Sequence, residues 1–158
     1  MPKVQNSLQS KQILIVDDSE ILRESFKLKF EKLGATVYVC GTLERALSLL
    51  KGLASQDQAP NLIIADLMLP NCSGLQVLRS IRHTLAGADP IIVIASQGFN
   101  QLAQANMQVL GARAYVEKPV LTNTLFAFVL ELLREDFITT EIGASIQLVD
   151  QKSKKIPA

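Results

Sequence analysis

Five short apolar runs, rich in β-branched residues, recur along this chain and are separated by segments with helical spacing. Because each run is continuously apolar rather than alternating, it predicts a strand covered on both faces, as in a parallel sheet between two layers of helices. The expected strands are Ile13–Val16, Thr36–Val39, Leu62–Ala65, Ile91–Ala95 and Ala114–Val116.

Helical periodicity fills the intervals between these runs. The expected helices lie at about Glu20–Leu33, from Thr42 to Gly52, from Ser73 to Ile81, at Asn100–Leu110 and at Thr122–Arg134. Alternating strands and helices predict an α/β fold: a flavodoxin-like, doubly wound, five-stranded parallel sheet of order 2-1-3-4-5 with five helices. In such a fold a ligand binds at the carboxyl ends of the strands, between the first strand and the third.

Length and composition are those of one globular domain, with 158 residues and 48% hydrophobic content. We expect a flexible lead at 1–10, the domain at 11–135, and an extension or linker at 136–158. The lead lacks the pattern of a secretory signal, and Cys40 and Cys72 are expected to be reduced thiols, so a cytoplasmic location is predicted. A net charge of +1 gives no reason to expect nucleic-acid or membrane binding.

Acidic side chains follow two strands that are neighbours in the predicted sheet. Asp17 and Asp18 come directly after the first strand, and Asp66 follows the third. Three carboxylates at one edge repel one another, so the cluster needs a cation or protonation, and hard oxygen ligands favour Mg²⁺, or Mn²⁺ in its place. Ser96 and Lys118 end the fourth and fifth strands and are expected to join this edge.

Four motifs, in order and each at a strand end, resemble the receiver domain of two-component response regulators over roughly Lys11 to Glu135. These motifs are Ile-Leu-Ile-Val-Asp17-Asp18-Ser, Leu-Ile-Ile-Ala-Asp66-Leu-Met-Leu-Pro70, Ile-Val-Ile-Ala-Ser96 and Tyr115-Val-Glu-Lys118-Pro119. Any one of them alone is weak, whereas the whole set is specific.

The resemblance implies that Asp66 accepts a phosphoryl group from a histidine kinase or a histidine phosphotransfer protein. It implies a metal held directly by Asp18, partly through water by Asp17, by an Asp66 oxygen, and by the main-chain carbonyl of Met68. Lys118 is expected to contact Asp66 first and the phosphoryl group afterwards. The chain would then be a signalling module that catalyses only its own phosphorylation and dephosphorylation, rather than an enzyme acting on other substrates.

The resemblance also implies a route from the site to a partner. Ser96 would swing toward the new phosphoryl group, and Tyr115 would turn inward, altering the face made by the fourth helix, the fifth strand and the fifth helix. The resemblance further implies a cis peptide bond between Lys118 and Pro119. The downstream protein is not identified by the sequence.

Each of these residues alone also has a structural explanation. Asp17, Asp18 and the following serine suit the cap of the first helix, Ser96 suits a satisfied buried hydroxyl, and Tyr115 suits a core aromatic. Two departures from the family pattern bear on the lifetime of the phosphorylated state. Gln97 stands where a small residue is usual. The apolar Met68 is expected to order attacking water poorly, which predicts slow self-dephosphorylation.

Three functions are compatible with the sequence to different degrees. The leading one is a phosphorylation-dependent protein-interaction module without an attached effector, and the alternative is the N-terminal regulatory fragment of a longer response regulator with a DNA-binding or enzymatic output domain. A hydrolase of the aspartyl-phosphate type needs a second acid two residues after the nucleophile, where this chain has Met68. The tail after residue 135 packs back, forms a homodimer or leads to a further domain, and the sequence leaves these alternatives open.

Overall fold

The structure, a computed structural model, describes residues 7–85, 87–97, 111–134 and 146–148. Its elements in chain order are β1 (Gln12–Val16), α1 (Glu20–Glu31), β2 (Thr36–Cys40), α2 (Leu43–Ala54), β3 (Leu62–Ala65), α3 (Gly74–Thr84), β4 (Ile91–Ser96), β5 (Ala114–Glu117), α5 (Thr122–Arg134) and β6 (Ile146–Leu148). The expected fourth helix at Asn100–Leu110 lies outside the described residues.

The sheet has the order β2-β1-β3-β4-β5-β6. Strands β1 to β5 are parallel throughout, so the predicted five-stranded order is confirmed. Val16 pairs with Ala65, and Ala65 pairs with Ile94, so β1, β3 and β4 end side by side. This edge is where the predicted topology places a ligand.

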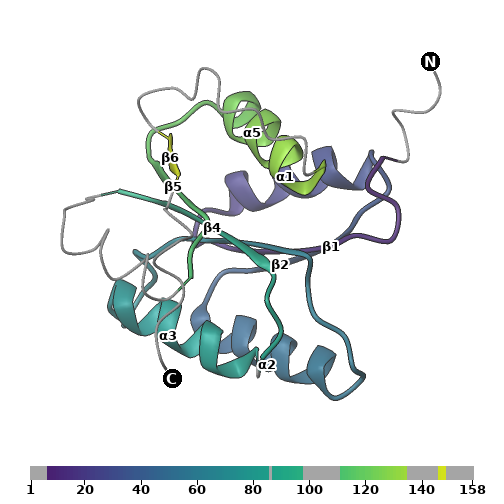
Figure 1. Cartoon of the computed structure of the whole chain (residues 1–158). Coiled ribbons are helices and arrows are strands. Elements are labelled where there is room, and N and C mark those ends of the chain that lie inside the picture. Colours follow the sequence, from purple (N-terminus) through teal and green to yellow (C-terminus); the bar gives the residue numbers. More distant parts are fainter. Residues whose placement is uncertain (1–6, 86, 98–110, 135–145, 149–158) are drawn as a thin grey trace.

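Two helical layers cover the sheet, with α1 and α5 on one face and α2 and α3 on the other (Figure 1). Successive residues of one strand serve opposite cores: Ile13 and Ile15 pack into the cluster beneath α1 and α5, whereas Leu14 and Val16 pack into the cluster beneath α2 and α3. Burial on both faces explains why the strands read as continuous apolar runs.

Hydroxyl residues begin three helices. The side chains of Ser19, Thr42 and Ser73 accept hydrogen bonds from the main-chain N–H groups three residues later, as N-cap residues do. The helix cap expected around Asp17 and Asp18 is therefore made by the serine that follows them, which leaves both carboxylates for other contacts.

Two segments outside the expected core pack against it. Leu8, in the part predicted as a flexible lead, is 1% exposed, and its N–H donates to the carbonyl of Leu33 at 2.9 Å. In the tail, β6 pairs antiparallel with β5, with Tyr115 opposite Gln147. Of the alternatives for the tail, packing back onto the domain is thus observed for Ile146–Leu148.

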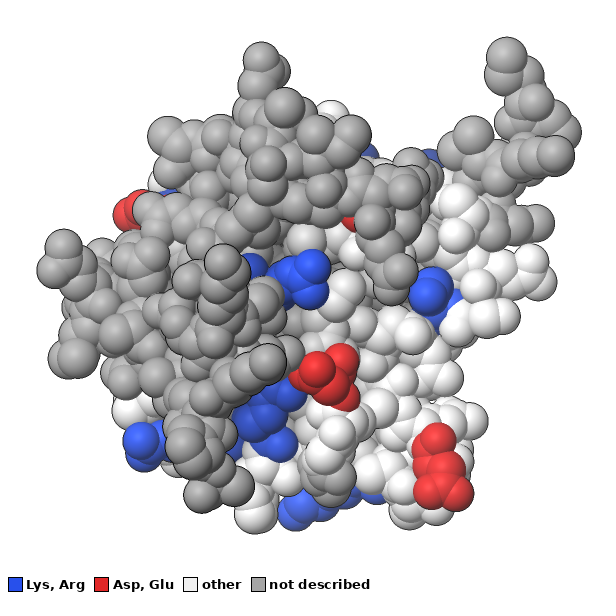
Figure 2. Space-filling model, in the orientation of Figure 1, with Lys and Arg blue, Asp and Glu red and all other residues white. Residues whose placement is uncertain are grey.

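No described helix is long and apolar enough to cross a lipid bilayer. On the face shown in Figure 2, basic and acidic side chains are both present and are scattered among uncharged residues.

Candidate functional site

Three carboxylates meet at the carboxyl edge of the sheet. Each of Asp17, Asp18 and Asp66 offers one oxygen, and these atoms lie within 4.8 Å of one another. The side chains of Asp17 and Asp66 are buried, whereas Asp18 is exposed at the mouth of the crevice. The convergence expected from sequence is therefore present, and it is produced by the pairing of β1 with β3.

Main-chain hydrogen bonds extend the sheet by one residue beyond its strands and so fix the two buried acids. The N–H of Asp17 donates to the carbonyl of Cys40 at 3.0 Å, and the N–H of Asp66 donates to the carbonyl of Val16 at 2.8 Å. Both acids are thus held in register with the neighbouring strands, and their side chains emerge where the apolar core ends.

Lys118, which follows β5, bridges the two buried acids. Its Nζ lies 2.6 Å from Asp17 Oδ2 and 3.1 Å from Asp66 Oδ2. Burial alone would lower the pKa of Lys118, but the hydrogen bond and the charge of Asp17, together with those of Asp66, raise it overall, so the ammonium is charged at neutral pH. The peptide bond between Lys118 and Pro119 is cis, as the resemblance predicts.

Asp66 is held at both carboxylate oxygens. Oδ1 accepts hydrogen bonds from the N–H of Met68 at 2.8 Å and from the hydroxyl of Ser96 at 2.9 Å, and Oδ2 faces Lys118. The three donors come from three different segments of the chain, so the orientation of this carboxylate is strongly determined. The side chain of Met68 is 62% exposed.

Asp17 carries a desolvation penalty that its partners do not fully offset. Burial raises its pKa, against the lowering effects of the hydrogen bonds from Lys118 and from the N–H of Ser19. An additional positive charge near this carboxylate would favour its ionised form.

The donor set fits a small hard cation. The three acids provide negative charge in excess of the single ammonium of Lys118, and carboxylate oxygens are the ligands that Mg²⁺ prefers. Asp18 is suited to such a cation because its carboxylate is exposed beside the two buried ones. The expected ligand role of the Met68 carbonyl stays a prediction.

Ser96 and Tyr115 connect Asp66 to β5. The Ser96 hydroxyl reaches Asp66, and the phenolic hydroxyl of Tyr115 donates to the main-chain carbonyl of Ser96 at 3.2 Å. Tyr115 is 2% exposed, so its ring already faces inward. Burial, followed by the charges of Glu117 and Asp66, raises the pKa of Tyr115 to about 12.

One functional candidate was missed from sequence. Arg23, one turn into α1, donates from Nη1 to the main-chain carbonyl of Asp17 at 2.8 Å. A signal was present, because a cation near the N-terminus of a helix faces the positive end of the helix dipole and is disfavoured there unless it has a specific partner. Its guanidinium also lies against Gly41, at the end of β2.

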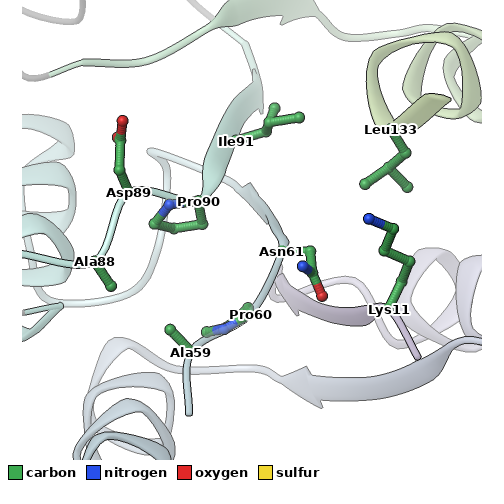
Figure 3. A pocket seen from close by; sticks show the side chains of 9 residues that line it. All are labelled: Lys11, Ala59, Pro60, Asn61, Ala88, Asp89, Pro90, Ile91 and Leu133. Atoms are coloured by element: carbon green, nitrogen blue, oxygen red, sulfur yellow. The ribbon is translucent and has the colours of Figure 1, made fainter. Parts of the chain in front are cut away.

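A hollow of about 290 Å³ lies at the opposite edge of the sheet, between the starts of β3 and β4 and the end of α5. Figure 3 shows Lys11, Asn61 and Leu133 around it, with Asp89 at its rim. The cluster of three acids in the described part of the chain lies at the carboxyl edge, which is therefore the candidate functional site.

Comparison with known proteins shows similarity over most of the chain. The family model described as "Response regulator receiver domain" matches residues 13–130. The transcriptional regulatory protein CpxR of Klebsiella pneumoniae is 32% identical over 146 residues, which are 89% of this chain and 59% of that protein. The Regulator of RpoS of Escherichia coli is 33% identical over 113 residues, which are 72% of this chain and 32% of that protein.

Solved structures show the same fold. A CheY-like response regulator receiver domain from Methanospirillum hungatei has a TM-score of 0.67 at 26% identity, covering 79% of this chain and 94% of that chain. The receiver domain of the histidine kinase CKI1 from Arabidopsis thaliana has a TM-score of 0.69 at 23% identity, covering 85% of this chain and 96% of that chain. This chain spans between about a third and three fifths of the length of the curated relatives described above. Fold, motifs and family match agree, and the chain belongs to the family of response regulator receiver domains.

Proposed function

We propose that the chain accepts a phosphoryl group on Asp66 from a phosphohistidine of a histidine kinase or phosphotransfer protein, and that it signals through the phosphorylated form. The observation that carries this proposal is the bridge formed by Lys118 between Asp17 and Asp66, with the Asp18 carboxylate exposed beside them. A nucleophile, a fixed cation and a set of metal-ligating oxygens are thereby assembled in one crevice.

The transfer is an in-line displacement. A carboxylate oxygen of Asp66 forms a bond to phosphorus as the phosphorus–nitrogen bond of the donor breaks, and the electron pair returns to the donor imidazole, which takes a proton from solvent. Lys118 and the Ser96 hydroxyl already lie at this carboxylate, so they are in place to interact with the charge on the transferred group.

A divalent cation would be held by Asp17, Asp18 and Asp66, with the Met68 carbonyl as the further ligand implied by the family. When bound, it would neutralise negative charge on the phosphoryl oxygens. The receiver domain of CKI1 has been crystallised with Mg²⁺ and BeF₃⁻, which supports the same ion here.

Exposed apolar side chains lie close in sequence to the reactive residues and suit the docking of a protein donor. Of the four large apolar side chains that are exposed in the described part of the chain, three are Ile21, Met68 and Leu121. Each lies within three residues of one of the reactive side chains. Their exposure at this one edge favours a protein partner over a free small molecule. We also propose a cytoplasmic location for the chain, where it would meet such a partner.

The signal is proposed to leave through β5 and α5. Tyr115 is hydrogen-bonded to Ser96, and Ser96 to Asp66, so a change at the acceptor reaches β5 through two contacts. The edge of β5 is paired with β6, so a downstream protein or a second copy of the chain would meet α5 and the β6 edge rather than an open β5 edge. The expected contribution of the fourth helix concerns residues outside the described part of the chain.

The decisive experiment incubates the protein with Mg²⁺ and a small phosphodonor and analyses it for an acid-stable, base-labile phosphate. One phosphoryl group per chain is expected in the wild type and none in Asp66→Ala. Asp89→Ala is the matched control, because it removes an exposed carboxylate at the opposite edge of the sheet and should be labelled to the same extent as the wild type. Absence of label in the wild type, or label that survives Asp66→Ala, refutes the proposal.

A second candidate function is the regulatory part of a longer transcriptional regulator. It is favoured by relatives such as CpxR, which is named a transcriptional regulatory protein and of which this chain covers 59%. Sequencing the gene beyond the codon for Ala158 tests this candidate, since an immediate stop codon contradicts it and a continuing reading frame with a DNA-binding motif supports it.

A further inference from the structure

We propose that Arg23 is a positioning residue for the metal site: its guanidinium fixes the peptide between Asp17 and Asp18, and so aims the Asp18 carboxylate toward the other two acids. This inference rests on the proposed phosphoryl-acceptor function, which requires a metal site. The contact that carries it is the hydrogen bond of 2.8 Å from Arg23 Nη1 to the carbonyl of Asp17.

Arg23 occupies an unfavourable position for a cation, one turn from the N-terminus of α1. Its charge faces the positive end of the helix dipole, which costs some stability. A charge-assisted hydrogen bond to a half-buried carbonyl offsets this cost and gives the side chain a fixed direction. The guanidinium is therefore directed back over the start of its own helix toward the acidic pair.

The carbonyl that Arg23 binds belongs to the peptide leading into Asp18. The side chain of Asp17 is separately fixed by the N–H of Ser19 on Oδ1 and by Lys118 on Oδ2. Asp18 itself is exposed, so its direction depends on the backbone on either side of it. With Arg23 removed, the peptide before Asp18 loses one of the contacts that orient it.

Because Gly41 has no side chain, the guanidinium of Arg23 can occupy the space beside it. A Cβ added at this position would lie 2.9 Å from Arg23 Nη1 and 3.4 Å from its Cζ. Such a contact is too close, but the end of a flexible side chain can move aside at little cost. Gly41→Ala should therefore displace the guanidinium from the Asp17 carbonyl while leaving the main chain in place, so that a second substitution removes the same contact.

A control for charge alone is available at the same edge. Arg45 on α2 lies close enough to Cys40 for its positive charge, like that of Arg23, to act on the thiol. Its side chain is exposed, and its main-chain N–H donates to the cap of α2. If Arg23 acted only by its charge, loss of Arg45 would have a comparable effect.

The test compares Arg23→Ala, Arg23→Lys, Gly41→Ala, the Arg23→Ala/Gly41→Ala double variant and Arg45→Ala. Because the chain has no tryptophan, the amide NMR signals of Asp18 and Ser19 are followed, first without metal and then during titration with Mg²⁺. Arg23→Ala should shift both signals in the metal-free protein and weaken Mg²⁺ binding roughly 10-fold, as loss of an outer-shell contact does. Arg23→Lys should recover most of this affinity, because its ammonium can donate to the same carbonyl.

Gly41→Ala should weaken Mg²⁺ binding in the same direction, the double variant should be no weaker than Arg23→Ala, and Arg45→Ala should bind normally. An unchanged affinity in Arg23→Ala, an equal loss in Arg45→Ala, or multiplying losses in the double variant would overturn the proposal. Failure of the proposed function is distinguishable: a wild type that takes up no phosphate, while its Mg²⁺ affinity still depends on Arg23, refutes phosphoryl acceptance and leaves the positioning role intact.

Discussion

The two ends of the same parallel strands differ in how they treat polar side chains. At the carboxyl end, Asp17, Asp66 and Ser96 are at most 4% exposed and are hydrogen-bonded to one another or to Lys118. At the amino end, the polar side chains around the hollow, those of Lys11, Asn61 and Asp89 (Figure 3), are partly or fully exposed. Burying a charged group is unfavourable unless it is paired, and among the described residues the buried carboxylates lie at the carboxyl end, where the proposed chemistry needs them.

The amino end uses its polar groups to continue the sheet. The side chain of Asn61 accepts a hydrogen bond from the N–H of Gln12 at 2.7 Å, and its main chain bonds to Gln12 and to Ile91. These contacts add one rung to the ladder beyond β3. Similar residue types thus serve a reactive crevice at one end of the sheet and strand alignment at the other.

The largest effect that separates the two ends is expected from Lys118→Ala. Loss of this cation removes the charge that faces Asp17 and Asp66, so the rate of phosphorylation by a small phosphodonor at saturating Mg²⁺ should fall by roughly 100-fold or more. Lys11→Ala removes a lysine from the hollow at the other end and should leave the rate unchanged. Equal rates in the two variants would show that the carboxyl end is not the reactive one.

An intermediate effect is expected from the pH dependence of Tyr115. An unfolded chain ionises tyrosine near pKa 10.0, whereas burial and the charges of Glu117 and Asp66 raise the pKa of Tyr115 to about 12. Between these values the folded state keeps a proton that the unfolded state loses, so the free energy of unfolding falls as the pH rises through this window, by up to about 2 to 3 kcal/mol.

Tyr115→Phe should remove the contribution of Tyr115 and so make that fall smaller, and absorbance titration of the phenolate should lose the group that ionises near pH 12. At neutral pH the variant should lose little stability, because the Ser96 carbonyl still accepts the N–H of Lys118 at 2.9 Å. If a tyrosine still ionises near pH 12 in the variant, the tyrosine with the raised pKa is not Tyr115, and the prediction is wrong.

The strands were predictable because each is encoded by a local run of apolar residues. The range Leu62–Ala65 and the helix Thr122–Arg134 match the structure at both ends. The site was predictable for a different reason: parallel topology turns distant residues such as Asp17 and Asp66 into neighbours once the strand order is known.

The misses depend on contacts that no local pattern encodes. Gly52 was expected to end a helix, but α2 continues to Ala54 because Leu53 is buried against the core, which outweighs the low helix propensity of one exposed glycine. Strand β6 is three residues long, too short for any periodicity, and exists through its pairing with β5. The place of Arg23 near a helix N-terminus signals that this cation needs a partner, but the sequence does not identify the partner as the main-chain carbonyl of Asp17.

The smallest expected effect makes the sharpest comparison between the two ends. Asn61→Ala removes the acceptor of the Gln12 N–H while leaving the main-chain bonds of position 61, so the free energy of unfolding in urea should fall by about 1 kcal/mol. Ser96→Ala is the matched variant at the carboxyl end, since it also removes one side-chain hydrogen bond, the one to Asp66. Both should be similarly destabilised, yet only Ser96→Ala should slow phosphorylation, because only its hydroxyl lies at the acceptor. A comparable slowing in Asn61→Ala would mean that the alignment of β1 with β3, set at the amino end, also controls the geometry of Asp17 and Asp66, and that the two ends are coupled through the strands themselves.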